Sequence, residues 1–245
     1  ERTLDDLRKR LGRFAKSCRV PIHEITAARI QDFLVNLKVS GRTQNNFRMT
    51  ISNMFNFARL RGYVGKDQNP AAEVPQAKEV QGDVGIFTPD EMTTLLEHGL
   101  DKFKPFLAIA AFAGLRTAEV ERLDWSDVGT QYIKVRGSNS KTGAHRLVEI
   151  QPNLQAWLTQ LRKPSGPVVL VANVTNAQVR LIRKAKIKWK HNALRHSYGS
   201  YRLALLKDPA KVAYEMGNSP RMVFAHYREL VTSEEANRWF NVLPP

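Results

Sequence analysis

Two arginines lie in short segments whose residue types could bind an anion and act on it. Arg116 belongs to the sequence Gly-Leu-Arg-Thr-Ala-Glu at 114–119, and Arg195 belongs to Asn-Ala-Leu-Arg-His-Ser at 192–197. A guanidinium group is always charged and can bind an oxyanion through two hydrogen bonds. Each arginine could instead form an ordinary surface ion pair. Arg116, however, follows the apolar run 106–115, where an unpaired arginine would be costly, and this favours a functional role.

Two further segments add an amine and a hydroxyl group. The sequence Ser-Lys-Thr-Gly at 140–143 places Lys141 on an expected turn, and Met-Gly-Asn-Ser at 216–219 precedes Tyr227. Taken singly these are weak signals, because a turn lysine is often solvated and a tyrosine is usually packed. Transfer of a phosphodiester to a protein hydroxyl needs a nucleophile, cations around the phosphate oxygens and a proton donor. The four segments together contain all three.

The charge of the chain indicates the same kind of partner. Its 245 residues include 38 Lys and Arg against 23 Asp and Glu, which gives a formal net charge of +15. The stretch 150–207 contains no acidic residue, so phosphates could supply the missing counter-charge. We expect nucleic acid as the partner ahead of an anionic membrane surface, and a merely basic protein is the plain alternative. The predicted DNA contacts are Arg48, Arg183, Lys184, Lys186, Lys188 and Lys190.

Other classes of site are disfavoured by the sequence. Cys18 is the one cysteine, so no intrachain disulfide can form. No group of His, Cys, Asp or Glu has the spacing of metal ligands, and we predict neither a metal nor a cofactor. Apolar runs stay well below the length of a membrane span or signal peptide, so we expect a cytoplasmic protein without a membrane partner. Because the sequence starts with Glu1, we also expect further residues upstream.

Local patterns predict the elements that position these segments. Residues 1 to about 62 have apolar residues at helical spacing, with Thr26 as an N-cap and Gly62 just past a helix end. Residues 76–87 are polar and contain two glycines, which is typical of a linker. A capping box at 88–91 then opens a second helical region.

The second region also contains the expected strands. Residues 131–136 and 145–151 alternate in polarity or are β-branched, which predicts a short antiparallel sheet around the turn of Lys141. A brief strand is also expected at 168–171. Helices account for the remainder, so the predicted fold class is mainly α with a small antiparallel β-sheet.

In this order, the four segments and Tyr227 resemble the tyrosine recombinase family, which includes the phage integrases. No single segment is decisive, but the set is specific and covers essentially the whole chain. The resemblance implies a helical SAM-like core DNA-binding domain at 1–75, a linker at 76–87 and a catalytic domain at 88–245 with a C-terminal oligomerisation tail. It further implies a metal-independent enzyme that recombines double-stranded DNA site-specifically.

The resemblance gives each matched residue a role. Tyr227 is the nucleophile that forms a 3′-phosphotyrosine, and Arg116 and Arg195 hold the scissile phosphate. Lys141 protonates the departing 5′-oxygen. Two more matched residues are expected to hold these groups in position without contacting the DNA themselves. Glu119 is an orienting carboxylate, and His196 supports the second arginine.

Two positions depart from the family's pattern. The family commonly has His where this chain has Asn192, and His or Trp where it has Asn218. An asparagine can donate a hydrogen bond to a phosphate oxygen, but it cannot carry a proton near neutral pH. Loss of such acid–base help typically slows a reaction by roughly a hundred- to ten-thousand-fold. We keep both asparagines as catalytic positions and hold His191 and His226 as weak candidates for a replacement base.

The resemblance also leaves alternatives open. It implies a homotetramer on DNA, and a monomer or weak oligomer without it, because family members dock their C-terminal segment on a neighbouring subunit. The apolar residues that could dock in this way, or pack within their own chain, are Ala236, Trp239, Phe240, Val242 and Leu243. A topoisomerase-like or resolvase-like activity shares the same chemistry. An integrase-like DNA-binding protein with weak or no catalysis is the alternative that the two asparagines motivate.

Overall fold

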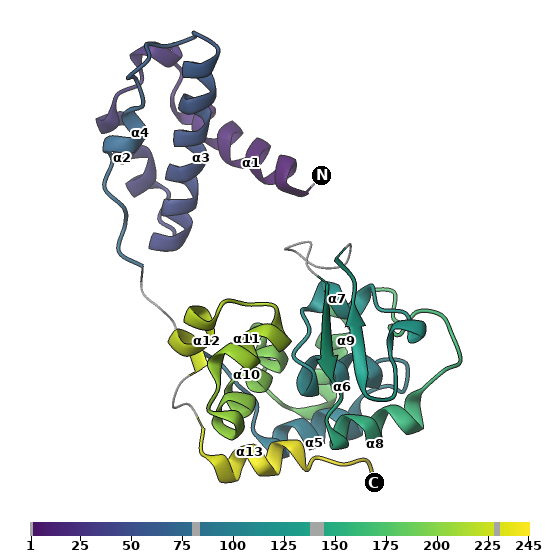
Figure 1. Cartoon of the computed structure of the whole chain (residues 1–245). Helices are drawn as coiled ribbons and strands as arrows, with labels where there is room; N and C mark the ends of the chain where they lie inside the picture. Colours follow the sequence, from purple (N-terminus) through teal and green to yellow (C-terminus); the bar gives the residue numbers. More distant parts are fainter. Residues whose placement is uncertain (1, 80–83, 138–144, 228–230) are drawn as a thin grey trace. The chain divides into compact units, whose positions relative to one another are not determined.

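The chain forms two compact units, Glu1–Gly82 and Asp83–Pro245 (Figure 1). Each unit has a hydrophobic core of its own. The division falls within the segment 76–87, while the functions assigned to the two parts remain predictions. The computed structural model describes residues 2–79, 84–137, 145–227 and 231–245.

The described part of the first unit is helical. Its elements are α1 (Arg2–Ser17), the 3-10 turn η1 (Ile22–Glu24), α2 (Ala27–Asn36), α3 (Gly41–Leu60) and α4 (Pro70–Glu73). The side chain of Thr26 accepts a hydrogen bond from the backbone N–H of Arg29, so the predicted N-cap of α2 is confirmed. Gly62 follows α3 with φ +71°, as expected of a residue just past a helix end.

Aromatic side chains hold the first unit together. Phe33 of α2 packs edge-to-face on Phe47 of α3, with ring centroids 5.8 Å apart, and on Phe14 of α1 at 5.1 Å. Ile51 and Phe55 continue the face of α3 that begins at Phe47, and both are buried. Their spacing of four residues places them on one side of a helix, which is why the amphipathic pattern predicts this core.

The described part of the second unit surrounds one very apolar helix. Helix α6 (Lys104–Phe112) is buried from Pro105 onward, and α8 (Pro152–Leu161) and α10 (Ala193–Leu206) pack against it (Figure 1). The unit contains α5 (Pro89–His98), α6 (Lys104–Phe112), α7 (Thr117–Glu121), η2 (Trp125–Asp127), β1 (Tyr132–Val135), β2 (Arg146–Glu149), α8 (Pro152–Leu161), α9 (Val174–Ala185), α10 (Ala193–Leu206), α11 (Pro209–Met216), α12 (Pro220–Tyr227) and α13 (Ser233–Phe240).

The two expected strands form an antiparallel sheet. The register pairs Tyr132 with Glu149 and Val135 with Arg146. Strand β2 alternates buried and exposed residues, so Arg146 shares the buried face with Val148. The predicted turn with Lys141 falls at 138–144, outside the described residues. Fold class, mainly α with a small antiparallel sheet, is confirmed.

The prediction of a strand at 168–171 is wrong. In its place the structure has an isolated bridge between Asp124 and Pro167. The backbone N–H of Val168 bonds to the carbonyl of Leu123, 2.9 Å away. On the other side of the bridge the N–H of Leu123 bonds to the carbonyl of Val120 at 3.1 Å and η2 begins at Trp125, so the pairing does not extend into a ladder. The apolar run 168–171 therefore packs on the core as irregular chain.

The C-terminal helix α13 packs within its own unit, against α10 and α5 (Figure 1). Trp239 is fully buried, stacks on Tyr201 with ring centroids 4.5 Å apart, and contacts Phe112 edge-to-face. Ala236 and Val242 are also buried. Of the two readings of this apolar segment, intramolecular packing accounts for these three side chains. The oligomerisation role remains a prediction.

Among the residues that the structure describes, no helix is both long enough and apolar enough to cross a bilayer.

Candidate active site

The turn between α6 and α7 positions Arg116. Gly114 has a left-handed backbone with φ +64°, and a Cβ atom there would lie 2.2 Å from Cδ1 of Tyr198. Only glycine therefore fits between the end of α6 and this ring. Arg116 follows as the residue that precedes α7 and is half-buried. The Gly-Leu-Arg sequence thus has a steric reason as well as a chemical one.

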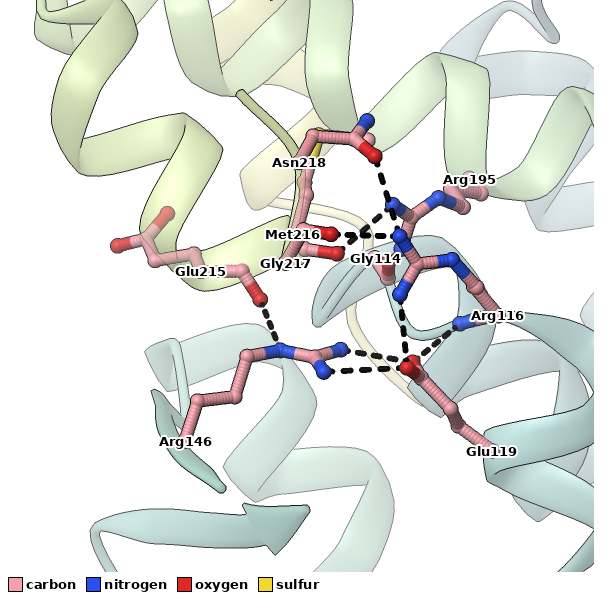
Figure 2. Close-up of polar contacts among 9 residues, drawn as sticks. All are labelled: Gly114, Arg116, Glu119, Arg146, Arg195, Glu215, Met216, Gly217 and Asn218. Atoms are coloured by element: carbon pink, nitrogen blue, oxygen red, sulfur yellow. Dashed lines mark hydrogen bonds and ion pairs between the residues drawn. The ribbon is translucent and has the colours of Figure 1, made fainter. Parts of the chain in front are cut away.

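Glu119, in the first turn of α7, is the centre of a hydrogen-bond network (Figure 2). Its carboxylate accepts bonds of 2.9 Å from the backbone N–H and from Nη1 of Arg116, and bonds of 3.1 and 2.7 Å from Nη1 and Nη2 of Arg146. Burial tends to raise the pKa of Glu119, but the hydrogen bonds from both arginines outweigh burial and lower that pKa. Glu119 is therefore a fixed negative charge that orients two guanidinium groups.

Arg146 is a site residue that the sequence analysis missed. Its side chain is 5% exposed, and its Nε donates to the carbonyl oxygen of Glu215 at 2.9 Å. The sequence did contain a signal for it. Arg146 shares the inward face of a predicted strand with Val148, and a buried arginine needs a carboxylate or carbonyl partner.

Arg116 reaches from the start of α7 to the end of α11. Its Nη2 donates to the carbonyl oxygen of Gly217 at 2.5 Å and to Oδ1 of Asn218 at 3.1 Å (Figure 2). Gly217 ends α11 with φ +62°, and a Cβ atom there would lie 3.0 Å from Nη1 of Arg146. The glycine of Met-Gly-Asn-Ser is therefore required both by the backbone and by the arginines beside it.

Arg195, in the first turn of α10, lies beside Arg116 (Figure 2). Its Nη1 donates to the carbonyl of Gly114 at 2.5 Å and its Nη2 to the carbonyl of Met216 at 2.7 Å. Burial, followed by the positive charge of Arg116, lowers the pKa of Arg195 to about 10. The group is still protonated at neutral pH, and it lies close enough to Arg116 to feel its charge.

The cluster carries more positive than negative charge. Arg116 and Arg146 bind the carboxylate of Glu119, and Arg195 lies near enough to interact with it electrostatically, so three cations face one anion within this network. Cations held together at low dielectric repel strongly unless an anion joins them. The arrangement is therefore suited to binding a group with negatively charged oxygens.

Tyr227 ends α12 beside these cations and is 5% exposed. Its ring packs against α10 at Gly199, where a Cβ atom would lie 2.9 Å from Cε2 of the tyrosine. Burial raises the pKa of Tyr227, and the positive charges of Arg195 and Arg116 partly offset this. Gly199 thus leaves room for the ring of Tyr227. The two arginines favour the deprotonated form of the Tyr227 hydroxyl group.

His196 lies against Tyr227. Its Nδ1 is 3.0 Å from the Tyr227 hydroxyl oxygen, and the two ring centroids are 5.7 Å apart. The expectation that His196 supports the neighbouring arginine did not foresee this contact. On a helix, successive side chains point about 100° apart, so Arg195 and His196 face different groups. Burial, followed by the charge of Arg195, lowers the pKa of His196 to about 4.

Comparison with known sequences gives two relatives and no matching family model. Both are Sinorhizobium fredii proteins, y4qK and y4eF, which are named as candidate integrases/recombinases. They are 26% and 27% identical to the chain over 185 and 186 residues, which is 69% of this chain in each case. The chain spans 60% of the length of the first and 73% of the second.

Solved structures match the fold of this chain over most of its length. A lambda integrase dimer bound to a COC′ core site has a TM-score of 0.76 over 94% of this chain and 90% of that one, at 16% identity. The chain has the tyrosine recombinase fold. The Tn1549 transposon integrase in complex with a circular intermediate DNA matches over 97% of this chain and 92% of that one, with a TM-score of 0.69 and 17% identity. The resemblance identified from the sequence motifs is confirmed.

Within this recombinase fold, Asn192 stands apart from the network around Glu119. It is exposed, precedes α10 with φ +54°, and makes no side-chain capping bond there. Asn192 thus lies before the helix, so helical geometry does not set its direction relative to His191. Asn218, in contrast, joins the network through its bond to Arg116. Lys141 lies outside the described residues.

The residues predicted to contact DNA fall into two groups. Four of them are exposed at the end of α9 and in the segment that follows it, namely Arg183, Lys184, Lys186 and Lys188. The other two bind backbone within their own units. Lys190 donates to the carbonyl of Ile86 at 2.6 Å, with its Nζ 5.8 Å from the centroid of the Phe87 ring. Arg48 donates to the carbonyls of Val74 and Ala72, which the end of α4 leaves without helical partners.

Proposed function

We propose that the chain is a site-specific DNA recombinase of the integrase type, which cuts and rejoins double-stranded DNA through a 3′-phosphotyrosine at Tyr227. The observation that carries this proposal is the convergence of Arg116, which precedes α7, with Arg195 of α10 and Tyr227 of α12. The names of the sequence relatives and the DNA-bound lambda and Tn1549 integrases support it.

In the proposed reaction the arginines bind the non-bridging oxygens of the scissile phosphate. A guanidinium group has five N–H bonds, and the carbonyls of Gly114 and Met216 engage two from Arg195. The remaining N–H groups can bind an anion. Since Glu119 and the carbonyls already hold the guanidinium groups in place, little reorganisation is needed when charge develops on the phosphate.

The covalent step then exchanges one phosphodiester bond for another. The hydroxyl oxygen of Tyr227 bonds to phosphorus, the bond to the 5′-oxygen breaks, and the DNA is left attached through its 3′-phosphate. We assign the proton for the departing 5′-oxygen to Lys141. Attack by a 5′-hydroxyl of another strand reverses these steps and rejoins the DNA. Positively charged arginines supply the electrostatic stabilisation, so this scheme needs no metal.

Further contacts to DNA are proposed for the four exposed basic residues Arg183, Lys184, Lys186 and Lys188. Their side chains extend from a stretch without acidic residues, so phosphates are their natural counter-ions. We also propose assembly into a homotetramer on DNA, as in the lambda integrase tetramer bound to a Holliday junction. Because Trp239 belongs to the core of its own unit, the subunit contact would use exposed residues such as Leu243.

The test is formation of a covalent protein–DNA adduct. A duplex selected by the protein from a random-sequence pool, nicked near its centre so that the cleaved end diffuses away, is incubated with wild type and with Tyr227→Phe. The adduct is resolved on a denaturing gel. We expect an adduct from wild type alone. Equal adducts from both proteins would assign the nucleophile to another residue, and specific binding with no adduct from either would contradict the enzymatic proposal.

A second candidate function is DNA binding with weak or no catalysis. The observation that favours it is the bond from Arg116 to Oδ1 of Asn218, which uses that amide as a hydrogen-bonding group at a position where the family has His or Trp. The amide cannot move a proton. The adduct assay separates the two functions. Relaxation of a supercoiled plasmid, without recombination between two sites, would instead favour the topoisomerase-like activity.

A further inference from the structure

The proposed cleavage requires a group that takes the proton from Tyr227. A phenol is a poor nucleophile while it keeps its proton, and burial raises the pKa of this one further. Neither Asn192 nor Asn218 can accept a proton near neutral pH. A base must therefore come from elsewhere in the site.

His196 is placed to be that base. Its Nδ1 is 3.0 Å from the Tyr227 hydroxyl, which is hydrogen-bond distance between the two reacting heavy atoms. A buried tyrosine hydroxyl normally donates to a partner, and this histidine nitrogen is the acceptor recorded for it among the described residues. The backbone supports this contact, because His196 lies on α10, the same helix whose Gly199 receives the tyrosine ring.

We propose that His196 accepts the phenolic proton of Tyr227 during strand cleavage and returns it during rejoining. This inference rests on the proposed function of Tyr227 as the nucleophile. It goes beyond the sequence expectation, in which His196 only supports Arg195.

The proton and electron pairs balance in this step. The hydroxyl oxygen of Tyr227 forms a bond to phosphorus with one of its lone pairs, and its O–H bond breaks. The lone pair on Nδ1 of His196 takes the proton, which converts the imidazole to an imidazolium. The P–O5′ bond breaks and its electron pair leaves on the 5′-oxygen, which takes a separate proton from the acid assigned to Lys141. Rejoining runs both transfers backwards.

The surroundings keep the His196 ring unprotonated, so that its nitrogen has a free lone pair. Burial first, and then the charges of Arg195, His191 and His226, lower the pKa of His196 to about 4, so the ring is neutral at pH 7. These groups come from the turn before α10, from α10 itself and from α12. A phosphate bound to Arg195 would offset part of that positive charge and make His196 a stronger base when DNA is present.

The other histidines near the nucleophile are placed less well. His226 precedes Tyr227 on α12, where successive side chains diverge by about 100°, and its ring centroid is 6.4 Å from that of the tyrosine. His191 is exposed in the turn before α10. No hydrogen bond to Tyr227 is recorded for either residue among the described ranges. They form the competing assignments in the test.

The test measures the single-turnover rate of adduct formation on the nicked duplex, at protein concentrations that saturate binding. Wild type is compared with His196→Ala, His196→Gln and His226→Ala. We expect the two His196 variants to bind DNA normally but to form the adduct roughly a hundred- to ten-thousand-fold more slowly. Glutamine keeps a hydrogen bond to the hydroxyl but takes no proton, so it separates proton transfer from positioning.

Added imidazole distinguishes proton transfer by His196 from a purely structural role, because it can replace a missing base but not a missing packing contact. The His196→Ala variant should regain adduct formation as imidazole is added, whereas His196→Gln, whose side chain fills the space, should regain little. A substrate with sulfur in place of the bridging 5′-oxygen is a further control. Its leaving group needs no proton, so it should relieve the defect of Lys141→Ala while leaving the defect of His196→Ala.

The outcomes distinguish this inference from the function on which it rests. If wild type forms an adduct that Tyr227→Phe lacks, but His196→Ala or His196→Gln matches the wild-type rate, the proton acceptor is another group and only the inference fails. A defect confined to His226→Ala would transfer the role to His226. If wild type itself forms no adduct, the proposed function and the role of His196 fall together.

Discussion

The candidate site has two sides that are built in different ways. On the arginine side, Arg116, Arg146 and Arg195 are tied to Glu119 and to backbone carbonyls from separate elements. On the tyrosine side, Tyr227 is held by ring packing and by its hydrogen bond to His196. A dense network of charged hydrogen bonds fixes the direction of each guanidinium group, whereas ring packing fixes position with fewer directional bonds. The site therefore combines an anion-binding half held by many charged hydrogen bonds with a nucleophile held by packing and one hydrogen bond.

The largest effect should follow from removing the carboxylate of the arginine side. Glu119→Ala leaves Arg146 buried and without its bidentate partner, so we expect the free energy of unfolding to fall by about 3–5 kcal/mol. Urea unfolding of the purified variant measures this. Asp90→Ala, which removes an exposed ion pair with Arg238, is the control and should change stability by less than about 1 kcal/mol. Similar losses in the two variants would show that the network is no more rigid than the surface.

A methyl group at Gly114 should act next most strongly. Gly114→Ala forces a left-handed residue to carry a Cβ atom 2.2 Å from the ring of Tyr198, which is fully buried. Backbone strain and overpacking together should lower the free energy of unfolding by roughly 2–4 kcal/mol. The thermal midpoint measures the loss. Gly12→Ala is the matched control, because nothing lies within 4 Å of its added Cβ atom and a helical alanine is favourable. An unchanged midpoint for Gly114→Ala would contradict the steric account.

The same substitution on the tyrosine side should separate stability from activity. Gly199→Ala places a Cβ atom 2.9 Å from the ring of Tyr227 and 3.1 Å from Cε of Met216. The ring and the flexible methionine can yield, and alanine favours the helix by about 1 kcal/mol, so we expect stability to change by less than about 1 kcal/mol. The displaced hydroxyl should nevertheless slow adduct formation at least about tenfold. A stable variant with wild-type adduct rate would mean that the nucleophile tolerates movement.

The contrast also explains what the sequence could predict. Capping at Thr88, the left-handed Gly62 and the pair of strands depend on neighbouring residues, and the structure agrees with each. Arg146 was missed because its partner, Glu119, is 27 residues away and the pairing exists only once the fold brings the two side chains within hydrogen-bond distance. Local patterns contain no information about that distance.

The tyrosine side was harder to predict for a related reason. Sequence order suggested that His196 supports Arg195, yet the turn of α10 directs the ring toward α12. Likewise, the basic character of Lys190 and Arg48 indicated DNA, but each side chain reaches a backbone carbonyl of its own unit. A charged residue's type predicts what it can bind, while the fold decides which partner lies within reach.

A further effect should appear in the pH dependence of stability. The pKa of His196 is about 4 in the folded protein and about 6.5 when unfolded, so between these values the unfolded state binds more protons. The free energy of unfolding should therefore rise as pH increases from about 4 to about 6.5, with a slope below that of one proton. Urea unfolding of wild type and His196→Gln across this range measures the slope, which should be shallower in the variant.

The arginine side responds to pH in a separate window. The pKa of Glu119 is lowered in the folded state, so its contribution is present above the unfolded pKa near 4.5 and is lost as pH falls through the lower folded value. The His196→Gln variant should show the same loss of stability at low pH that protonation of Glu119 causes in wild type. Parallel pH curves for the two proteins from pH 4 to 6.5 would mean that His196 is as solvated in the folded chain as in the unfolded one. The tyrosine side would then be open to water, and the two halves of the site would differ in polarity less than their packing indicates.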